Sequence, residues 1–218
     1  MLPAAALALS IATLHAAPEA NEPKASDPEA SELIRKLAQP PPATTAFTEV
    51  RFSPLLQQPL IVSGELGYSG PQNLERRVTQ PYAEHTVIRG ESVRVERSGQ
   101  APRTFALQRA PELRGLLTGF VALLSGDSEA IAAGFDVRLA SDAAHWTLDL
   151  VPKDARVKRR VERFTVDGSN EQPHCFSMMA SGGGVSVMLL GELASVRLPA
   201  QPTLADLQQL CARGLAPA

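Results

Sequence analysis

The sequence predicts an α+β protein built mainly from antiparallel β-strands. Short segments in which apolar and polar residues alternate recur about every ten residues, with Gly, Pro, Asp or Asn between them, which is typical of an antiparallel meander. Near the middle of the chain the apolar residues change to a helical period. The length of 218 residues suits one domain with a sizeable core.

The N-terminal segment indicates export. Residues 1–17 form an apolar run of small residues and Leu that ends near an Ala-x-Ala-like site. A membrane span needs about 20 apolar residues, so the run is better explained as a cleavable signal peptide. A buried N-terminal helix is the alternative. Residues 18–30 are rich in Pro, Ala and Glu and predict a flexible lead, which leaves residues 31–218 as a single folded domain.

A first helix is expected to begin at the end of this lead, near Ser26 or Asp27. Pro28 then falls in the first turn, and Glu29 completes a capping box. The helix must stop before the prolines at 40–42, which cannot continue it.

Residues 47–68 predict a β-hairpin with arms at 47–52 and 60–68. Val50 and Phe52 share one face of the first arm. Because successive strand side chains point to opposite sides, each arm can bury one face and expose the other. The residues that line up on one face of the second arm include Leu60, Val62, Leu66 and Tyr68.

The remaining elements follow the same logic. An amphipathic helix is predicted over 111–126, with Gly126 as its C-terminal cap. Asp127 suits the N-cap of a short helix that runs to Ala133, and Thr203 suits the N-cap of the last helix. Further strands are predicted at residues 74–78, 84–88, 92–97, 103–107, 135–139, 146–150, 157–166, 175–179 and 185–190.

Charge argues against nucleic-acid binding. The formal net charge is -2, and phosphate contacts need clustered Lys and Arg. One local cluster exists, at residues 158–160 with Arg156 and Arg163. We interpret it as the solvated face of a strand, with contact to anionic membrane lipid as the alternative.

The two cysteines, Cys175 and Cys211, allow one disulfide between a late strand and the C-terminal helix. Two buried free thiols are the alternative, since strand-to-helix geometry cannot be read from the sequence.

No catalytic or metal site is predicted. His85, His145 and His174 are scattered, and none belongs to an H-x-x-x-H or C-x-x-C pair. The sequence contains no nucleophile elbow, phosphate-binding loop or dinucleotide fingerprint, and the glycines at 182–184 predict a turn between two strands. We therefore expect a protein that is not an enzyme and takes no cofactor.

A hydrophobic cavity is the site that the pattern favours instead. A sheet of about ten strands tends to curl, and helices on its concave side can leave an apolar pocket. Met178, Met179 and Met188, close in sequence across one hairpin, would make such a lining adaptable to a hydrophobic ligand. The alternative is that these residues fill a core.

The order of elements resembles the LolA-like family of periplasmic outer-membrane lipoprotein carriers. The resemblance covers roughly residues 30–200 and is carried by Phe-Thr-Glu-Val-Arg-Phe at 47–52, Gly-Glu-Leu-Gly-Tyr at 64–68 followed by Pro71, and Trp-Thr-Leu-Asp-Leu-Val-Pro-Lys at 146–153. A signal peptide, a short first helix and a mid-chain helical insertion fit the same pattern.

The resemblance implies an incomplete, strongly curved β-barrel with a helical lid over a hydrophobic cavity. A monomer would hold the acyl chains of a lipoprotein or another lipid there, between an inner-membrane donor and an outer-membrane acceptor. Carriers of this family have an Arg just before the Pro that follows the second strand, which latches the lid; here that position is Gly70. With the two methionines of the hairpin, the candidate lipid-binding residues are Val50, Phe52, Leu60, Val62, Leu66, Tyr68, Leu116, Phe120, Leu123, Met178 and Met188.

Two other functions stay open from the sequence. A non-enzymatic accessory module of an envelope complex would have a filled core in place of a cavity. A lipid-modifying hydrolase would need a nucleophile beside a base.

Overall fold

The structure is a computed structural model that describes residues 27–109, 111–142 and 144–214, without the side chains of residues 111–113, 115 and 116. The predicted signal peptide and residues 18–26 lie outside this range. The helices are α1 (Pro28–Lys36), η1 (Leu107–Arg109), α2 (Pro111–Leu124), α3 (Ser128–Gly134), α4 (Ala155–Lys158), η2 (Gly191–Ser195) and α5 (Leu204–Arg213). The strands are β1 (Ala43–Phe52), β2 (Leu60–Tyr68), β3 (Asn73–Gln80), β4 (Glu84–Arg89), β5 (Ser92–Arg97), β6 (Arg103–Ala106), β7 (Phe135–Ser141), β8 (Trp146–Pro152), β9 (Val161–Ser169), β10 (Gln172–Ala180) and β11 (Val185–Leu190).

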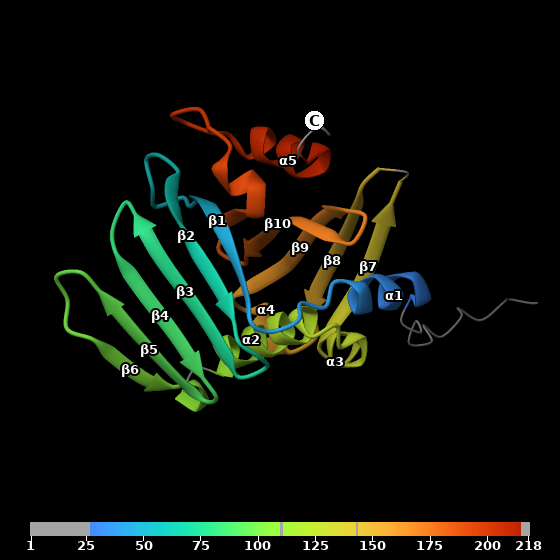
Figure 1. Cartoon of the computed structure of the whole chain (residues 1–218), viewed down its shortest axis with the longest axis horizontal. Helices are drawn as coiled ribbons and strands as arrows, with labels where there is room; N and C mark the ends of the chain where they lie inside the picture. Colours follow the sequence, from blue (N-terminus) through green and yellow to red (C-terminus); the bar gives the residue numbers. More distant parts are fainter. Residues whose placement is uncertain (1–26, 110, 143, 215–218) are drawn as a thin grey trace, which may run out of the picture.

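The described residues form one antiparallel sheet of eleven strands in the order β6-β5-β4-β3-β2-β1-β11-β10-β9-β8-β7. The first and last strands of this order do not pair with each other, so the barrel is incomplete, as predicted. Figure 1 shows the two arms of the sheet splayed apart, with α1, α2 and α3 on one side and α5 on the other. In the described part of the chain, no helix combines the length and the hydropathy needed to cross a membrane.

Side-chain caps fix the helix starts. Asp27 accepts a hydrogen bond from the backbone N–H of Glu29, and Asp127 accepts one from Ala130. Thr203 forms a reciprocal capping box with Asp206 at the start of α5. Because α1 begins at Pro28 and buries Ala30, the folded domain starts a few residues before the predicted end of the flexible lead.

The predicted strand over 157–166 is wrong in its first part. Asp154 accepts hydrogen bonds from the backbone N–H groups of Arg156 and Val157, which starts the one-turn helix α4. β9 begins only at Val161. The alternation of Val157 with charged neighbours therefore reflects one buried residue in a helical turn, and not the face of a strand.

Strand β1 lies at the centre of the sheet and is buried on both faces. Val50 pairs with Ile61 of β2, and Glu49 pairs with Val62. Directly paired residues point to the same side of a sheet, so Val50 and Val62 lie on opposite faces. The expectation that Val50 and Phe52 share a wall with Leu60, Val62, Leu66 and Tyr68 of β2 is therefore incorrect.

Two layers cover these faces. On the face of Val50, helix α5 packs through Leu207, and a disulfide joins Cys211 of α5 to Cys175 of β10. On the other face, α1, α2 and α3 pack against β7, β8 and β9 around Ile131, a fully buried residue. We call the second face the concave face.

Candidate functional site

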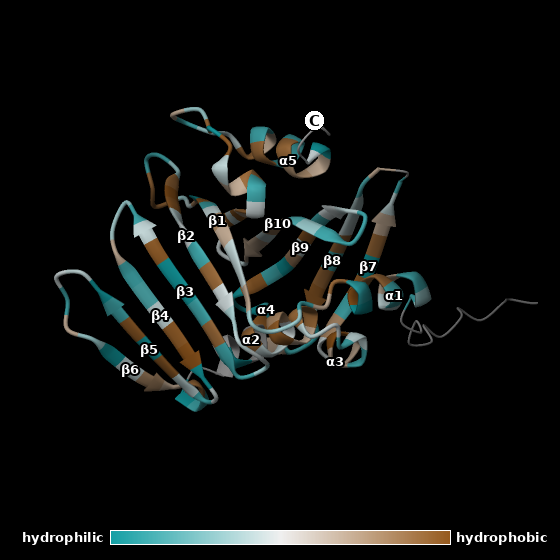
Figure 2. Ribbon diagram, in the orientation of Figure 1, coloured by the Kyte–Doolittle hydropathy of each residue, from teal (hydrophilic) through white to brown (hydrophobic). Residues whose placement is uncertain are grey.

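A cavity of about 750 Å³ lies on the concave face, between α2, the segment that follows α1, and strands from both arms of the sheet. This volume falls within the range of roughly 300–1,000 Å³ that is typical of small-ligand pockets. Figure 2 shows hydrophobic segments on α2 and on the strands that face it. The apolar side chains that line the cavity include Leu66, Tyr68, Leu74, Ile88, Leu117, Phe120, Leu123, Leu124, Val166, Phe176, Met188 and Leu190.

Helix α2 supplies the cover of the cavity. The ring of Phe120 packs edge-on against Phe176 of β10, with 5.6 Å between ring centroids. At Gly119 an added methyl group would lie 2.3 Å from the ring of Phe135, so only Gly lets α2 approach β7 this closely. The backbone N–H of Gln39 donates to the carbonyl of Leu124 and so ties the segment after α1 to the end of α2.

The structure brings part of the predicted set to the cavity. These residues are Leu66, Tyr68, Phe120, Leu123 and Met188. Val50 and Phe52 face the opposite side, where Val50 is fully buried beneath α5. Leu60 and Val62 share the cavity's face but pack with Phe47 and Val78.

The other two predicted residues lie elsewhere. Met178 packs against the core of α1, α3 and β7–β9, and the side chain of Leu116 lies outside the described part. Gly70, where the family latch would stand, occupies the β2–β3 turn with φ 113°, a conformation that favours Gly.

A buried ionic cluster lies beside the apolar wall, and the sequence pattern did not reveal it. Glu49 is only 6% exposed. Arg51 donates to both of its oxygens at 2.8 Å, Arg76 donates at 2.7 Å, and the Ser186 hydroxyl donates at 2.6 Å. The alternation of charge along β1 suggested a solvated face, but a central strand between two covered faces buries both.

The cluster continues toward the edge of the sheet. Arg76 Nη1 lies 3.6 Å from Oε1 of Glu84, and Arg97 Nη1 lies 4.0 Å from the second oxygen of Glu84. The guanidinium of Arg76 also lies 4.8 Å from the ring centroid of Phe47. Arg76 is the member of this cluster that lines the cavity.

Hydrogen bonds and neighbouring charges favour the ionised form of Glu49. Burial alone would raise the pKa of Glu49, but hydrogen bonds from Arg51 and Ser186 and the charges of Arg51 and Arg76 outweigh it and hold the pKa below 4.5. The same carboxylate raises the pKa of Arg51. The cluster therefore places paired charges beside a largely apolar wall, which Arg76 alone of the cluster reaches.

A second polar group lies on the other face of β8–β10. His145 Nε2 lies 3.3 Å from the carboxylate of Asp167, and the Ser169 hydroxyl lies 3.1 Å from His174 Nε2. Burial raises the pKa of Asp167 and lowers that of His174. Among the described residues, Asp167 forms its ion pair with His145 and none is formed by His174.

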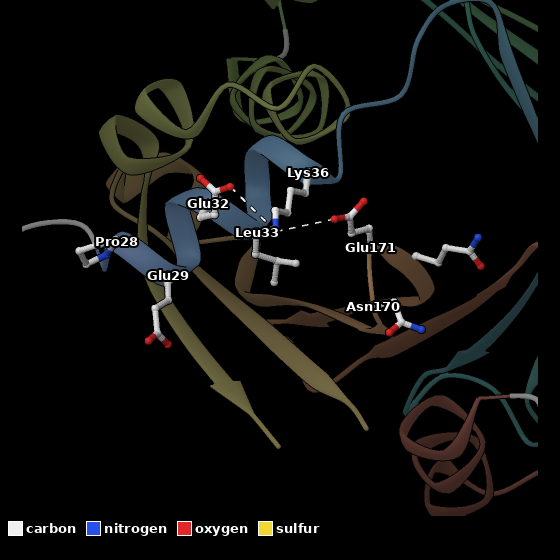
Figure 3. A pocket seen from close by; sticks show the side chains of 8 residues that line it. Pro28, Glu29, Glu32, Leu33, Lys36, Asn170 and Glu171 are labelled. Atoms are coloured by element: carbon white, nitrogen blue, oxygen red, sulfur yellow. Dashed lines mark ion pairs between the residues drawn. The ribbon is translucent and has the colours of Figure 1, made fainter. Parts of the chain in front are cut away.

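A second, more open hollow adjoins the rim of the cavity and shares Lys36, Glu171 and Gln172 with it. Figure 3 shows Lys36 of α1 between Glu32 and Glu171, at 4.0 Å and 3.7 Å from their oxygens. Lys36 thus connects α1 to the β9–β10 turn across the rim. All three side chains are about half exposed, so the contact is weak in water.

Comparison with solved structures gives likenesses of low identity. The LolA superfamily protein NE2245 from Nitrosomonas europaea is 13% identical, with a TM-score of 0.42, over 84% of this chain and 96% of that chain. LprF from Mycobacterium bovis is 11% identical, with a TM-score of 0.35, over 81% of this chain and 98% of that chain. A chain of the Pseudomonas aeruginosa MucA/MucB complex is 15% identical, with a TM-score of 0.35, over 83% of this chain and 60% of that chain.

Among curated proteins no relative matches this chain. The family model described as outer membrane lipoprotein carrier protein LolA-like matches residues 20–214, which is most of the sequence. The open, curved antiparallel sheet with its few helices agrees with that assignment. The chain therefore belongs to the family of LolA-like outer membrane lipoprotein carrier proteins.

Proposed function

We propose that this protein is a periplasmic carrier that holds the acyl chains of a lipoprotein or another lipid in the cavity under α2 and passes them toward the outer membrane. The observation that supports the proposal is the apolar lining of a cavity of about 750 Å³ on the concave face. Burial of each methylene group contributes about 0.8 kcal/mol, so acyl chains can bind there without a charged anchor.

Uptake and release require the cover to move. Helix α2 and the segment after α1 are joined by the hydrogen bond from Gln39 to Leu124, so we propose that they move as one lid. The exposed contact of Lys36 with Glu171 at the rim is weak enough to break without a large cost. In this proposal a monomer accepts cargo from an inner-membrane donor and delivers it to an outer-membrane acceptor, without covalent chemistry.

The experiment compares two substitutions on neighbouring residues of β4. Thr86 lines the cavity, whereas Val87 points to the other face of the sheet. Thr86→Trp should fill part of the cavity and weaken binding of a fluorescent fatty acid by roughly tenfold or more, because displaced methylenes lose their burial. Val87→Trp should bind the probe as the natural protein does.

Thermal unfolding of both variants shows whether each one folds. Equal probe binding by the Thr86→Trp and natural proteins would overturn the proposal, as would native mass spectra that show no bound lipid on protein purified from cells. The second of these results would favour an accessory module with no cargo.

A further inference from the structure

Two adjacent leucines project from the β1–β2 connection, residues 53–59. Leu55 is 94% exposed and Leu56 is 43% exposed, and they are the exposed large hydrophobic residues of the described chain. The turn is held in place, because the carbonyl of Ser53 accepts the N–H of Leu56 and its hydroxyl accepts the N–H of Leu55. A single exposed Leu is ordinary, but an ordered turn that presents two of them in an uncharged loop is not.

This loop lies at the same end of the sheet as the basic segment. A methyl group on Gly183 of the β10–β11 turn would lie 3.9 Å from Pro54. In that turn, Ser181 donates through its hydroxyl to the carbonyl of Lys158 and through its N–H to the carbonyl of Arg160. β1 and β9 are separated by three inter-strand steps, or about 14 Å. The leucines and the cations therefore lie at the same end of the strands, and we call this end of the sheet the docking edge.

The cations of this edge are Arg156, Lys158, Arg159 and Arg160, and all four are exposed. None of them forms an ion pair with a carboxylate of the described residues. Helix α4 explains the arrangement, because Asp154 uses its carboxylate to cap the turn that buries Val157 and turns its charged neighbours outward. The edge is locally cationic although the chain as a whole carries a formal charge of -2.

We propose that this edge, residues 53–59 together with residues 156–160, docks the protein on the surface of an anionic phospholipid bilayer. The two leucines enter the boundary between headgroups and acyl chains, and the four cations lie over the headgroup phosphates. Either contribution alone gives weak, reversible binding, whereas an apolar insertion beside a basic patch gives two attachment points. An anionic surface complements four cations that have no ion-pair partner in the described part of the chain, and a bilayer accepts exposed leucines without a shaped pocket.

The leucine loop of this edge lies away from the cavity. The ends of β1 and β2 that reach the cavity, at Ala43 and Tyr68, are opposite to the ends joined by the loop 53–59. The inference therefore goes beyond cargo binding and stands independently of it.

The test is co-sedimentation of the purified protein with phosphatidylcholine vesicles, with and without phosphatidylglycerol. We expect binding only to vesicles that contain phosphatidylglycerol, and loss of that binding at high salt, where charges are screened. Leu55→Ser with Leu56→Ser should weaken binding by roughly tenfold or more through lost apolar insertion. Arg159→Gln with Arg160→Gln should weaken it by a similar factor.

Matched controls keep the test specific. Arg89→Gln with Arg138→Gln removes the same charge from exposed sites away from this edge, and Gln57→Ser with Gln58→Ser changes the same loop without touching the leucines. Both should bind as the natural protein does. Binding that survives the leucine and arginine changes, or that is equal on neutral vesicles, overturns the proposal.

A third result also overturns it: no vesicle binding by the natural protein, together with binding to an acidic protein partner. Fatty-acid probe binding by the leucine variant separates this inference from the proposed function. It should be unchanged, because the loop does not line the cavity.

Discussion

The guanidinium of Arg76 donates to the carboxylate of Glu49 across strand β2, with 2.7 Å between Nη2 and Oε2. The contact ties β3 to β1 on the concave face, beside the cavity that Arg76 also lines. Arg51 and Ser186 complete the shell of donors around Glu49, so one carboxylate holds side chains from β1, β3 and β11 together. Arg76 thereby links this ionic cluster to the wall of the cavity.

Replacement of Glu49 should lower the stability of the folded chain. Glu49→Gln leaves the partly buried Arg51 and Arg76 without their common partner, and we expect a loss of about 2–4 kcal/mol in the free energy of unfolding. Urea denaturation measures this loss. Glu96→Gln is the control, because its pair with Arg94 is exposed and its removal should change stability by less than about 0.5 kcal/mol. Similar effects of the two changes would show that the Glu49 cluster is not a stabilising feature.

The same carboxylate predicts a dependence of stability on pH. The pKa of Glu49 lies below 4.5 in the folded chain, so the unfolded chain binds the proton more readily. The stabilisation that Glu49 contributes is complete above its pKa in the unfolded chain. It is lost as pH falls through its lower pKa in the folded chain. We expect the difference in urea midpoint between the natural protein and Glu49→Gln to shrink from about pH 6 to pH 3. A constant difference over that range would contradict the assignment.

The disulfide should stabilise the chain by closing a long loop. Cys175 and Cys211 are 36 residues apart, and loop closure of that length is expected to contribute about 3–4 kcal/mol. A reducing agent should therefore lower the urea midpoint of the natural protein. The double variant Cys175→Ala with Cys211→Ala should show the lower midpoint with or without reductant. No effect of reductant on the natural protein would mean that the pair is not bonded in solution.

Two glycines of β2 make a matched pair. A methyl group at Gly64 would lie 1.8 Å from the carbonyl oxygen of Arg77, where the register between β2 and β3 shifts. At Gly67 the nearest atom would be 3.5 Å away, an ordinary contact. Gly64→Ala should lower stability by about 2 kcal/mol or more, and Gly67→Ala should change it by less than about 1 kcal/mol. Thermal or urea unfolding of both variants measures the contrast, and equal losses would contradict the register at Gly64.

The local pattern of residues determined most of the elements. Alternation placed the strands of both arms, the helical period placed α2, and Asp127 and Thr203 marked helix starts because their side chains can accept backbone N–H bonds within one turn. The same local reasoning failed over 157–160. There an N-cap at Asp154 overrode an alternation that a strand and a short helix can share.

What the tertiary structure decided is which faces meet. Alternation alone divides β1 and β2 into two faces each. The pairing of Val50 with Ile61 puts Val50 on the opposite face from Leu66, and the packing then places Val50 beneath α5 and Leu66 in the cavity. The ionic cluster of Glu49 with Arg76 has the same cause, since it joins residues from strands that are not adjacent in the sheet. The sequence thus determined the period of each strand, whereas strand register, a long-range property, determined the wall of the cavity.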